Sequence, residues 1–345
     1  MKRVGLLGVP QSGKSTVFDI LLRGAGAAPA ASHGREQVGV VRVPDARIDR
    51  LSVLYNPRRT VYAQIQFVDT IATVAGSARS AAKGRDLFSS VRNCDALAAV
   101  LGDFDAASDP LRDLRTLEVE LVLNDLALVE GRMKRIEKEL RIGKRQHERE
   151  HALLVRCRQL LESERPMRGQ SFDAEEEKQL RGFQLLTLKP LLIVDNQGDA
   201  ARGGLADAAG AGREIVELQA LLEREVLRLP PGERDGFRAG LGIEEDGLSL
   251  VIRACYRLLG LISFFTVGED EVRAWTVGRG ARAVKAAGEI HSDLAKGFIR
   301  AEVVPWDKLL EAGSEARARE RAWLRLEGRD YEVQDGDCIT ICFSK

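Results

Sequence analysis

One octapeptide near the start of the chain restricts its fold more than any other feature. Its residues are Gly8-Val9-Pro10-Gln11-Ser12-Gly13-Lys14-Ser15, which fit the pattern G-x-x-x-x-G-K-[ST]. A short apolar strand is predicted before it at residues 3–9, and a helix after it from Lys14 to about Arg23. Glycines let the backbone curl so that N–H groups point at phosphate oxygens, and the N-terminus of the helix adds its dipole. The octapeptide therefore predicts a phosphate-binding loop, with a plain glycine-rich turn as the alternative.

The residue types around this loop also predict a metal. Lys14 is expected to reach the β- and γ-phosphates of a nucleotide, and the Ser15 hydroxyl to ligate Mg²⁺. Asp69 ends an apolar strand predicted at residues 60–68, where an acid that holds Mg²⁺ through water is expected, although an ordinary strand-end acid would look the same. The predicted metal ligands are therefore Ser15 and Asp69. The predicted phosphate-site residues are Gly8, Pro10, Gln11, Ser12, Gly13, Lys14, Ser15 and Thr16.

Strands that alternate with helices predict an α/β fold with a mostly parallel sheet. Apolar or alternating segments indicate the strands, and apolar residues at helical spacing indicate the helices. Stretches rich in glycine and small residues, at 24–36 and 70–86, are predicted to be loops. Further strands are predicted at 38–43, 96–101 and 188–194, and further helices at about 216–227 and 246–261.

A helical hairpin interrupts this alternation. Asp109 is a predicted N-cap before Pro110 at the first helical position, and a helix of about 30 residues follows. Gly143 interrupts it, and a second helix is predicted from about His147 to Glu162. Two long helices joined by a short turn form an antiparallel pair. The apolar positions of the first helix are Leu114, Leu117, Leu121, Leu126, Val129, Met133, Ile136 and Leu140.

After residue 262 the pattern changes to short strands punctuated by Gly and Asp turns. This change predicts a small mixed β domain of about 80 residues. Its strands are predicted at 262–267, 272–277, 299–304 and 338–343.

Charge and cysteine content exclude several classes of protein. Lys plus Arg and Asp plus Glu both number 52 in the 345 residues, so a whole-protein electrostatic footprint on nucleic acid is not expected. No apolar run approaches the roughly 18 residues of a membrane span, and no partnership with a membrane is predicted. The five cysteines form no C-x-x-C pair, which is typical of reduced thiols and predicts a cytoplasmic protein.

The zero net charge hides one basic segment at the predicted hairpin tip. Between Arg132 and Arg149 there are eight basic residues and three acids, a local charge of +5. Such a tip could contact nucleic-acid phosphates, with an ordinary solvated helical face as the alternative. The basic residues expected to make the contact are Arg132, Arg135, Lys138, Arg141, Lys144 and Arg145.

Beyond these patterns, several specific stretches resemble a known family nearly end to end. They are Val38-Gly39-Val40-Val41-Arg42-Val43-Pro44-Asp45, Gln184-Leu185-Leu186-Thr187, Val272-Arg273-Ala274-Trp275-Thr276, Ala286-Ala287-Gly288-Glu289-Ile290-His291, Lys296-Gly297-Phe298-Ile299-Arg300-Ala301-Glu302-Val303 and Tyr331-Glu332-Val333-Gln334-Asp335-Gly336-Asp337. With the phosphate loop, they resemble the YchF/Obg-like ATPases, P-loop relatives of the small GTPases with a C-terminal TGS domain.

The resemblance implies three parts, which agree with the patterns above. A G domain is expected at 1–108 and 184–262, a helical hairpin inserted into it at 109–183, and a β-grasp-like TGS domain at 263–345. Members of this family bind and slowly hydrolyse ATP, or GTP in some cases, and associate with ribosomes. The implied partners are therefore ATP or GTP and the ribosome, through its large subunit or rRNA, with the TGS domain taking part.

The base-reading motif of the family is altered here. Asn196-Gln197-Gly198-Asp199 stands where G proteins carry Asn-Lys-x-Asp and this family carries Asn-x-x-Glu. The resemblance assigns Asn196 and Asp199 to the nucleotide base. Asp199 could accept the N–H donors of guanine, whereas the family favours ATP, so both bases stay open.

Three positions that serve hydrolysis in the family are also altered. The resemblance places His33 where a Mg²⁺-binding Thr is usual, Ala72 where a Gly contacts the γ-phosphate, and Ala99 where a His orients water. The Ser-Ala-Lys segment near the base corresponds to Gln219-Ala220-Leu221. We therefore expect a protein that binds nucleotide and hydrolyses it slowly or not at all. The alternative is a non-catalytic adaptor that binds the ribosome or RNA and has a degenerate nucleotide site.

Overall fold

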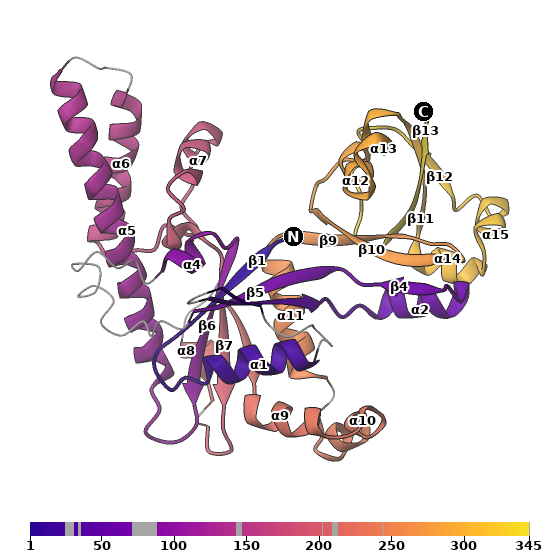
Figure 1. Cartoon of the computed structure of the whole chain (residues 1–345), viewed down its shortest axis with the longest axis horizontal. Coiled ribbons are helices and arrows are strands. Elements are labelled where there is room, and N and C mark those ends of the chain that lie inside the picture. The colour runs from indigo at the N-terminus through magenta and orange to yellow at the C-terminus, as the bar shows by residue number, and fades with distance from the viewer. Residues whose placement is uncertain are drawn as a thin grey trace. The chain divides into compact units, whose positions relative to one another are not determined.

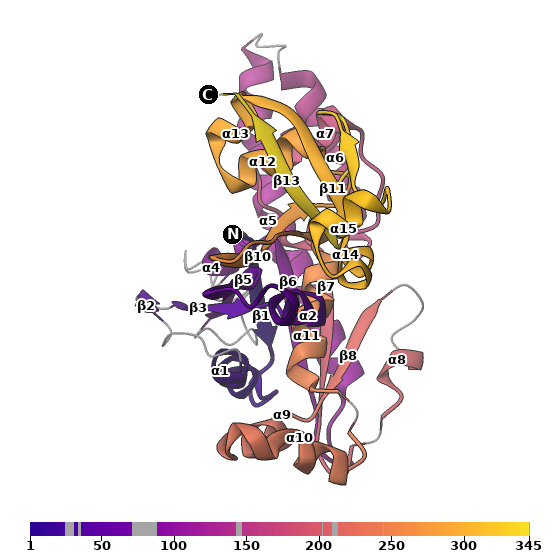
Figure 2. The ribbon, with the colours of Figure 1, turned by 90° about the vertical axis from the view of Figure 1, so that its right-hand side faces the viewer.

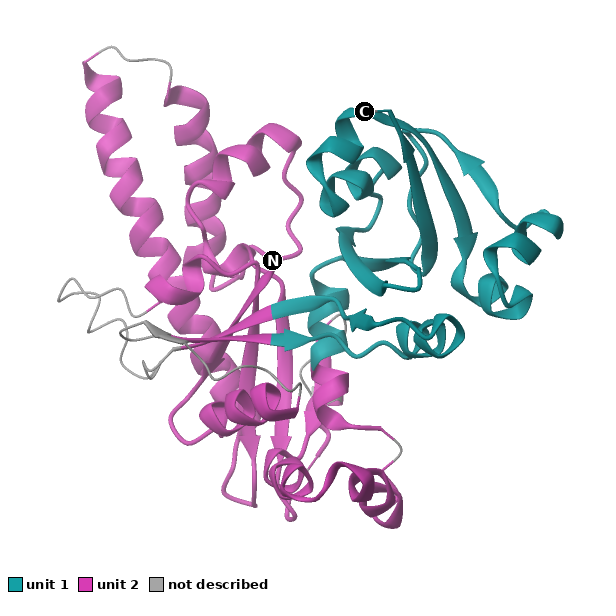
Figure 3. Cartoon of the chain, turned by 45° about the vertical axis from the view of Figure 1, so that its right-hand side comes forward, with its two compact units in different colours: residues 1, 41–65, 252–345 teal, residues 2–40, 66–251 magenta. Residues whose placement is uncertain are grey.

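The computed structural model describes residues 1–24, 31–33, 36–70, 88–142, 147–201, 203–208, 213–243 and 245–344. The chain divides into two compact units (Figure 3). One contains residues 2–40 and 66–251, and the other contains residues 1, 41–65 and 252–345. Both units combine helices with a β-sheet, which confirms the predicted α/β class.

The larger unit is built on a seven-stranded sheet of order β2-β3-β5-β1-β6-β7-β8 (Figure 1). The strands from β5 to β8 in this order are parallel, and β2 pairs with β3 antiparallel. Parallel strands end at one edge, so all five present their carboxyl ends together. The bounds are β1 Arg3–Gly8, β2 Ala31–His33, β3 Glu36–Arg42, β5 Gln64–Thr70, β6 Ala96–Asp103, β7 Leu191–Gln197 and β8 Glu214–Leu218.

Helices cover both faces of this sheet, because its central strands are apolar throughout. Leu6 and Leu7 of β1 are both buried although they point to opposite faces. Leu7 belongs to a core with Leu114 and Leu117 of α5 (Pro110–Arg141). Helix α1 (Lys14–Gly24) also packs on β1 and β6, and it contacts α9 (Ala220–Arg228) (Figure 2). The other helices outside the hairpin segment are α4 (Ser89–Arg92), α8 (Leu205–Ala208), α10 (Pro231–Gly240) and α11 (Gly247–Leu258).

The predicted helical hairpin is present as α5 and α6 (Glu148–Glu162) (Figure 1). Asp109 caps α5 as predicted, because its carboxylate accepts from Arg112 N at 2.9 Å. Beyond the part of α5 that packs on the sheet, Val129 and Ile136 form a separate core with Leu154 of α6. Gly143 lies outside the described residues. The chain returns to the sheet through α7 (Ala174–Arg181) and a 3₁₀ turn, η2 (Leu186–Leu188).

Two element predictions were wrong. The single strand predicted at 60–68 is two strands, since β4 (Arg59–Val61) pairs with β10 (Glu271–Gly278) in the other sheet and only β5 lies beside β1. The helix predicted from residue 216 begins at Ala220, because residues 214–218 form β8 beside β7. Both errors arise where the spacing of the apolar residues fits a helix as well as a strand, or one strand as well as two. In such segments the strand that pairs with them determines the structure. The loop predicted at 24–36 contains β2, and residues 71–87 lie outside the described part.

The smaller unit contains a six-stranded sheet of order β12-β11-β13-β9-β10-β4. Ile262 and Phe264 of β9 join the core formed with α12, whereas the ring of Phe265 lies 5.4 Å from the guanidinium of Arg47. This alternation covers both faces of β9. The strands are β9 Leu261–Thr266, β10 Glu271–Gly278, β11 Phe298–Pro305, β12 Arg325–Glu327 and β13 Asp337–Phe343, and the helices are α2 Ala46–Tyr55, α12 Ala283–Ile290, α13 Ser292–Lys296, α14 Trp306–Ala312 and α15 Glu315–Glu320.

No helix in the described ranges has both the length and the apolar character that a membrane span needs.

Candidate nucleotide-binding site

The loop between β1 and α1 leaves no room for a Cβ atom at two of its glycines. Gly13 has φ +84°, and a Cβ there would lie 2.2 Å from Nδ2 of Asn196. A Cβ on Gly8 would lie 2.4 Å from Oγ of Ser12. Gln11 also has a positive φ of 68°, which stores some strain in the loop. The glycines of the motif are therefore needed for close approach of neighbouring groups as well as for curvature.

Ser12 provides a test of whether this loop fits a ligand oxygen. Its N–H donates to the carbonyl of Val9 at 3.2 Å and closes the loop. Its hydroxyl is buried and has no hydrogen-bond partner among the described residues. A buried polar group without a partner costs about 1–3 kcal/mol, which a phosphate oxygen would recover. The loop therefore fits an anionic ligand.

Lys14 and Asp69, which the sequence assigns to phosphate and metal, meet in the structure. Asp69 lies on β5 opposite Leu6 of β1, and its side chain is 7% exposed. The ammonium of Lys14, at the start of α1, donates to this carboxylate. Ser15 follows on the exposed side of the first turn of α1. Two charges that would each be costly alone in this buried place thus neutralise each other.

Asn196 connects the phosphate loop to a distant part of the sheet. It lies near the end of β7 and is 3% exposed. Its Nδ2 donates to Ser12 O at 3.1 Å, and its Oδ1 accepts from Ala220 N, also at 3.1 Å. This side chain therefore acts as a tether that holds the loop against the start of α9.

Asp199 lies in different surroundings from Asn196. Its side chain is exposed, and with Gln197 and Gln219 it lines a cavity of about 510 Å³. Three further acids line the same cavity, which gives it an acidic wall: Glu217, Glu223 and Glu245. The two residues assigned to the base therefore lie in different places: Asn196 is buried beneath the phosphate loop, and Asp199 is exposed at the rim of a cavity.

The altered positions are only partly visible. Ala99 is buried on β6 between Leu7 of β1 and Ile193 of β7. An alanine there contributes to the core and offers no polar atom beyond its backbone. His33 ends β2, but its side chain lies outside the described residues, as does the whole of Ala72.

Sequence reasoning missed two buried acids at the same edge of the sheet. Asp103 ends β6, and its carboxylate accepts from Gly203 N at 3.1 Å. Asp195 of β7 is 1% exposed and accepts from Gln197 Nε2 at 3.0 Å through one oxygen only. Burial raises the pKa of Asp195, and the charges of Asp103 and Glu217 raise it further. An acid at the end of an apolar strand, the signal that located Asp69, would have found both.

We predict that Asp195→Asn stabilises the protein at pH 7 by about 1 kcal/mol, because it removes a buried charge that has one oxygen without a partner among the described residues. The pKa of Asp195 in the folded state lies above its ordinary value of 3.8, so the folded state takes up the proton first as pH falls. The advantage of the variant should therefore shrink at lower pH. Urea unfolding of both proteins at several pH values would measure this, and a difference that fails to narrow would contradict it.

A glycine-curled loop between a parallel strand and a helix, with Lys14 and Asp69 at the carboxyl edge of the sheet, defines a P-loop nucleoside triphosphatase fold. Comparison with known proteins gives the family. The chain is 37% identical over 362 residues to "Ribosome-binding ATPase YchF" of Bacillus subtilis, covering 99% of this chain and 98% of that protein. It is 35% identical to the protein of the same name from Escherichia coli O157:H7, covering 99% of both. The chain belongs to the YchF family.

A solved structure and a family model agree with this assignment. The structure of the Schizosaccharomyces pombe YchF GTPase superposes with a TM-score of 0.84 at 26% identity, covering 99% of this chain and 97% of that one. Residues 261–344 match the family model YchF-GTPase_C, described as "Protein of unknown function (DUF933)". These matches confirm the resemblance and the fold class predicted from the sequence.

Proposed function

We propose that this chain binds a purine nucleoside triphosphate at the β1–α1 loop, with ATP favoured over GTP. The observation that carries the proposal is the contact between Lys14 and Asp69 beneath a loop whose Ser12 hydroxyl has no partner among the described residues. Phosphate would become the new partner of the Lys14 ammonium. The relatives named as ATPases support adenine, and Asp199 at the rim of an acidic cavity leaves guanine to be tested.

The oxygen donors around this contact fit Mg²⁺. Magnesium is usually held by one or two carboxylates together with phosphates and waters, not by a cage of protein ligands. Ser15 and Asp69 would supply such a set. A cage of protein ligands is not found, since no cluster of three or more His, Cys, Asp and Glu side chains in the described ranges could hold a metal. When bound, the metal would neutralise charge on the phosphates. Asp69 would hold its hydration shell, and Ser15 would ligate it directly.

We further propose that hydrolysis is slow or absent. The position assigned to a water-orienting His is Ala99, which is 1% exposed and surrounded by apolar strands. A methyl group in a dry core cannot orient a nucleophile. This observation also supports the second candidate, a non-catalytic adaptor that binds the ribosome or RNA and has a degenerate nucleotide site.

Calorimetry on the purified full chain tests the nucleotide proposal. ATP, GTP and their diphosphates would be titrated with Mg²⁺ and again with EDTA. Binding of a triphosphate that weakens in EDTA is the expected result. No heat from any of the four nucleotides at millimolar concentration would refute the proposal, and turnover typical of an active ATPase would refute slow hydrolysis.

We propose that the ribosome, through its large subunit or rRNA, is the partner. The names of the relatives support ribosome binding, and the exposed Arg135, Lys138 and Arg141 support the hairpin tip as one contact. Arg132 has a different role, because its guanidinium pairs with both oxygens of Glu150 at 2.7 and 2.8 Å and so joins α5 to α6. Lys144 and Arg145 lie outside the described residues. The TGS domain would supply a second contact.

Charge reversal at the tip should weaken ribosome binding. We expect Arg135→Glu with Lys138→Glu to lower affinity about tenfold at low salt and to flatten its salt dependence, because fewer counterions are released. Co-sedimentation with ribosomes over a salt series measures both. The matched control is Arg115→Glu with Arg165→Glu, which makes the same charge change at exposed positions away from the tip. Equal loss in both double variants would remove the tip from the proposal.

We also propose the three parts implied by the family as the domain organisation: a G domain at 1–108 and 184–262, the hairpin at 109–183 and the TGS domain at 263–345. The proposed location is the cytoplasm. It is supported by the absence of disulfides among the described cysteines, four of which are buried free thiols.

A further inference from the structure

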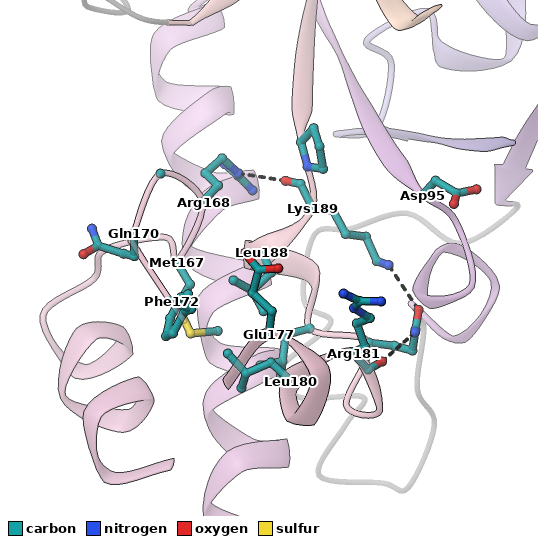
Figure 4. Close-up of a pocket in the computed structure, with 14 residues that line it drawn as sticks. Asp95, Met167, Arg168, Gln170, Phe172, Glu177, Leu180, Arg181, Leu188 and Lys189 are labelled. Atoms are coloured by element: carbon teal, nitrogen blue, oxygen red, sulfur yellow. Dashed lines mark hydrogen bonds between the residues drawn. The ribbon is translucent and has the colours of Figure 1, made fainter. Parts of the chain in front are cut away.

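A second cavity of about 360 Å³ lies at the other edge of the seven-stranded sheet from the phosphate loop (Figure 4). Asp95 stands just before β6, and Lys189 and Pro190 stand just before β7, so the cavity is at the amino ends of these strands. Its remaining walls come from the 167–172 loop, α7 and the segment that returns to the sheet. Neither the nucleotide proposal nor the ribosome proposal uses it.

Three basic side chains line this cavity. Lys189 is 8% exposed, and its ammonium donates to Cys94 O at 2.6 Å and to Gln184 Oε1 at 3.4 Å. Arg168 pairs with Glu118 at 3.1 Å, yet its Nη2 is buried without a partner in the described part of the chain. The Arg181 guanidinium makes no hydrogen bond or ion pair within the described ranges. Burial lowers the pKa of Lys189 and of Arg168, which shows that these cations are poorly solvated.

Arg168 is compensated by Glu118, whereas Lys189 and Arg181 form no ion pair with an acid among the described residues. Asp95 is already committed, since it accepts from Lys2 Nζ at 2.6 Å and from Arg3 N at 2.9 Å. Glu177 is exposed, one turn before Arg181 on α7, and the two do not form an ion pair. The described part of the lining therefore favours an anion, and in that part Glu177 is the acid that could receive a cationic group.

The opposite wall is apolar and preformed. Met167, Leu180 and Leu185 are each at most 2% exposed and belong to the hairpin core, so they support the wall from behind, and the half-buried Phe172 and Leu188 present its apolar surface. The ring of Phe172 is held by Arg156, whose guanidinium lies 4.7 Å from the ring centroid. Basic side chains beside a fixed apolar wall are typical of a small-molecule site, and 360 Å³ lies at the lower end of the range for such sites.

We propose that this cavity binds a small carboxylate with a short apolar body. Arg181 binds the carboxylate, since a guanidinium fork matches its two oxygens, and the wall beside Phe172 receives the body. A free short-chain acid and an apolar amino acid share this chemistry. In the second case the ammonium group meets Glu177.

The full chain tests this by calorimetry with four probes: 4-methylpentanoate, leucine, 4-methylpentanamide and inorganic phosphate. We expect one of the first two to bind and the amide to bind at least about tenfold more weakly, as loss of a charge-assisted hydrogen bond predicts. Inorganic phosphate, which lacks the apolar body, should also bind more weakly. Tighter binding of leucine that is lost in Glu177→Gln identifies the amino acid, and tighter binding of 4-methylpentanoate identifies the free acid.

The matched variants are Arg181→Met and Arg165→Met, both at exposed arginines that should tolerate the change. Arg181→Met should weaken binding of the preferred acid about tenfold, and Arg165→Met by less than about twofold. The proposal is overturned if no acid binds at 10 mM, roughly the weakest affinity worth assigning to a site. It is also overturned if the amide or phosphate binds as tightly, or if the two variants behave alike.

Discussion

Lys14→Met is expected to weaken ATP or GTP binding at least about 100-fold, which corresponds to about 2.7 kcal/mol. Lys14 is the one cation that the structure places at the β1–α1 loop beside a buried carboxylate among the described residues. Methionine keeps the aliphatic stem and removes only the charge and the donors. Calorimetry against the unmodified chain measures the loss.

The same substitution should also destabilise the protein, which could be mistaken for the cause of lost binding. Asp69 would remain as a buried carboxylate without its cation, and breaking such a pair costs about 3–5 kcal/mol. The double variant Lys14→Met with Asp69→Asn separates the two effects, because it removes both charges. It should recover most of the stability while nucleotide binding stays lost. A double variant that binds nucleotide as tightly as the unmodified chain would show that the phosphates lie elsewhere.

The parts of this site that could be predicted from the sequence are those that a short run of consecutive residues identifies. The loop, the helix after it and the strand-end Asp69 each depend on neighbouring residues, and the structure brings the side chains of Lys14 and Asp69 into contact. The tethering role of Asn196 could not be predicted in this way. Its partners Ser12 and Ala220 lie 184 and 24 residues away in the sequence. The residues next to Asn196 do not reveal that its amide nitrogen would bond to Ser12 and its amide oxygen to Ala220.

The fold shows the same division between local and distant signals. The long helix α5 was predicted within one or two residues because its cap, its Pro110 and its apolar spacing all agree. The strands β4 and β8 were misassigned, since their identity depends on β10 and β7 as pairing partners. In the smaller unit, α13 and α15 have five and six residues, which is too short for a helical period to appear in the sequence.

The other large effect is expected at Asp125 of α5, which is completely buried. Its carboxylate accepts from Leu186 N at 3.0 Å, from Thr187 N at 2.7 Å and from the Thr187 hydroxyl at 2.8 Å. The guanidinium of Arg92 lies 3.5 Å away. These bonds hold α5 to the segment that leads into β7. Because β7 carries Asn196, the same segment connects the base of the hairpin with the support of the phosphate loop.

Asp125→Ala should lower the free energy of unfolding by about 3–5 kcal/mol, because three buried donors lose their acceptor at once. Asp125→Asn keeps one acceptor oxygen and should fall between alanine and the unmodified chain. Urea unfolding gives the order of the three proteins, and hydrogen exchange should show faster exchange of the Leu186 and Thr187 amides. Glu130→Gln is the control, an acid on the same helix with no hydrogen bond or ion pair in the described ranges, and should stay within about 0.5 kcal/mol. If Asp125→Ala matched that control, the carboxylate would not be what fixes α5 to the strand.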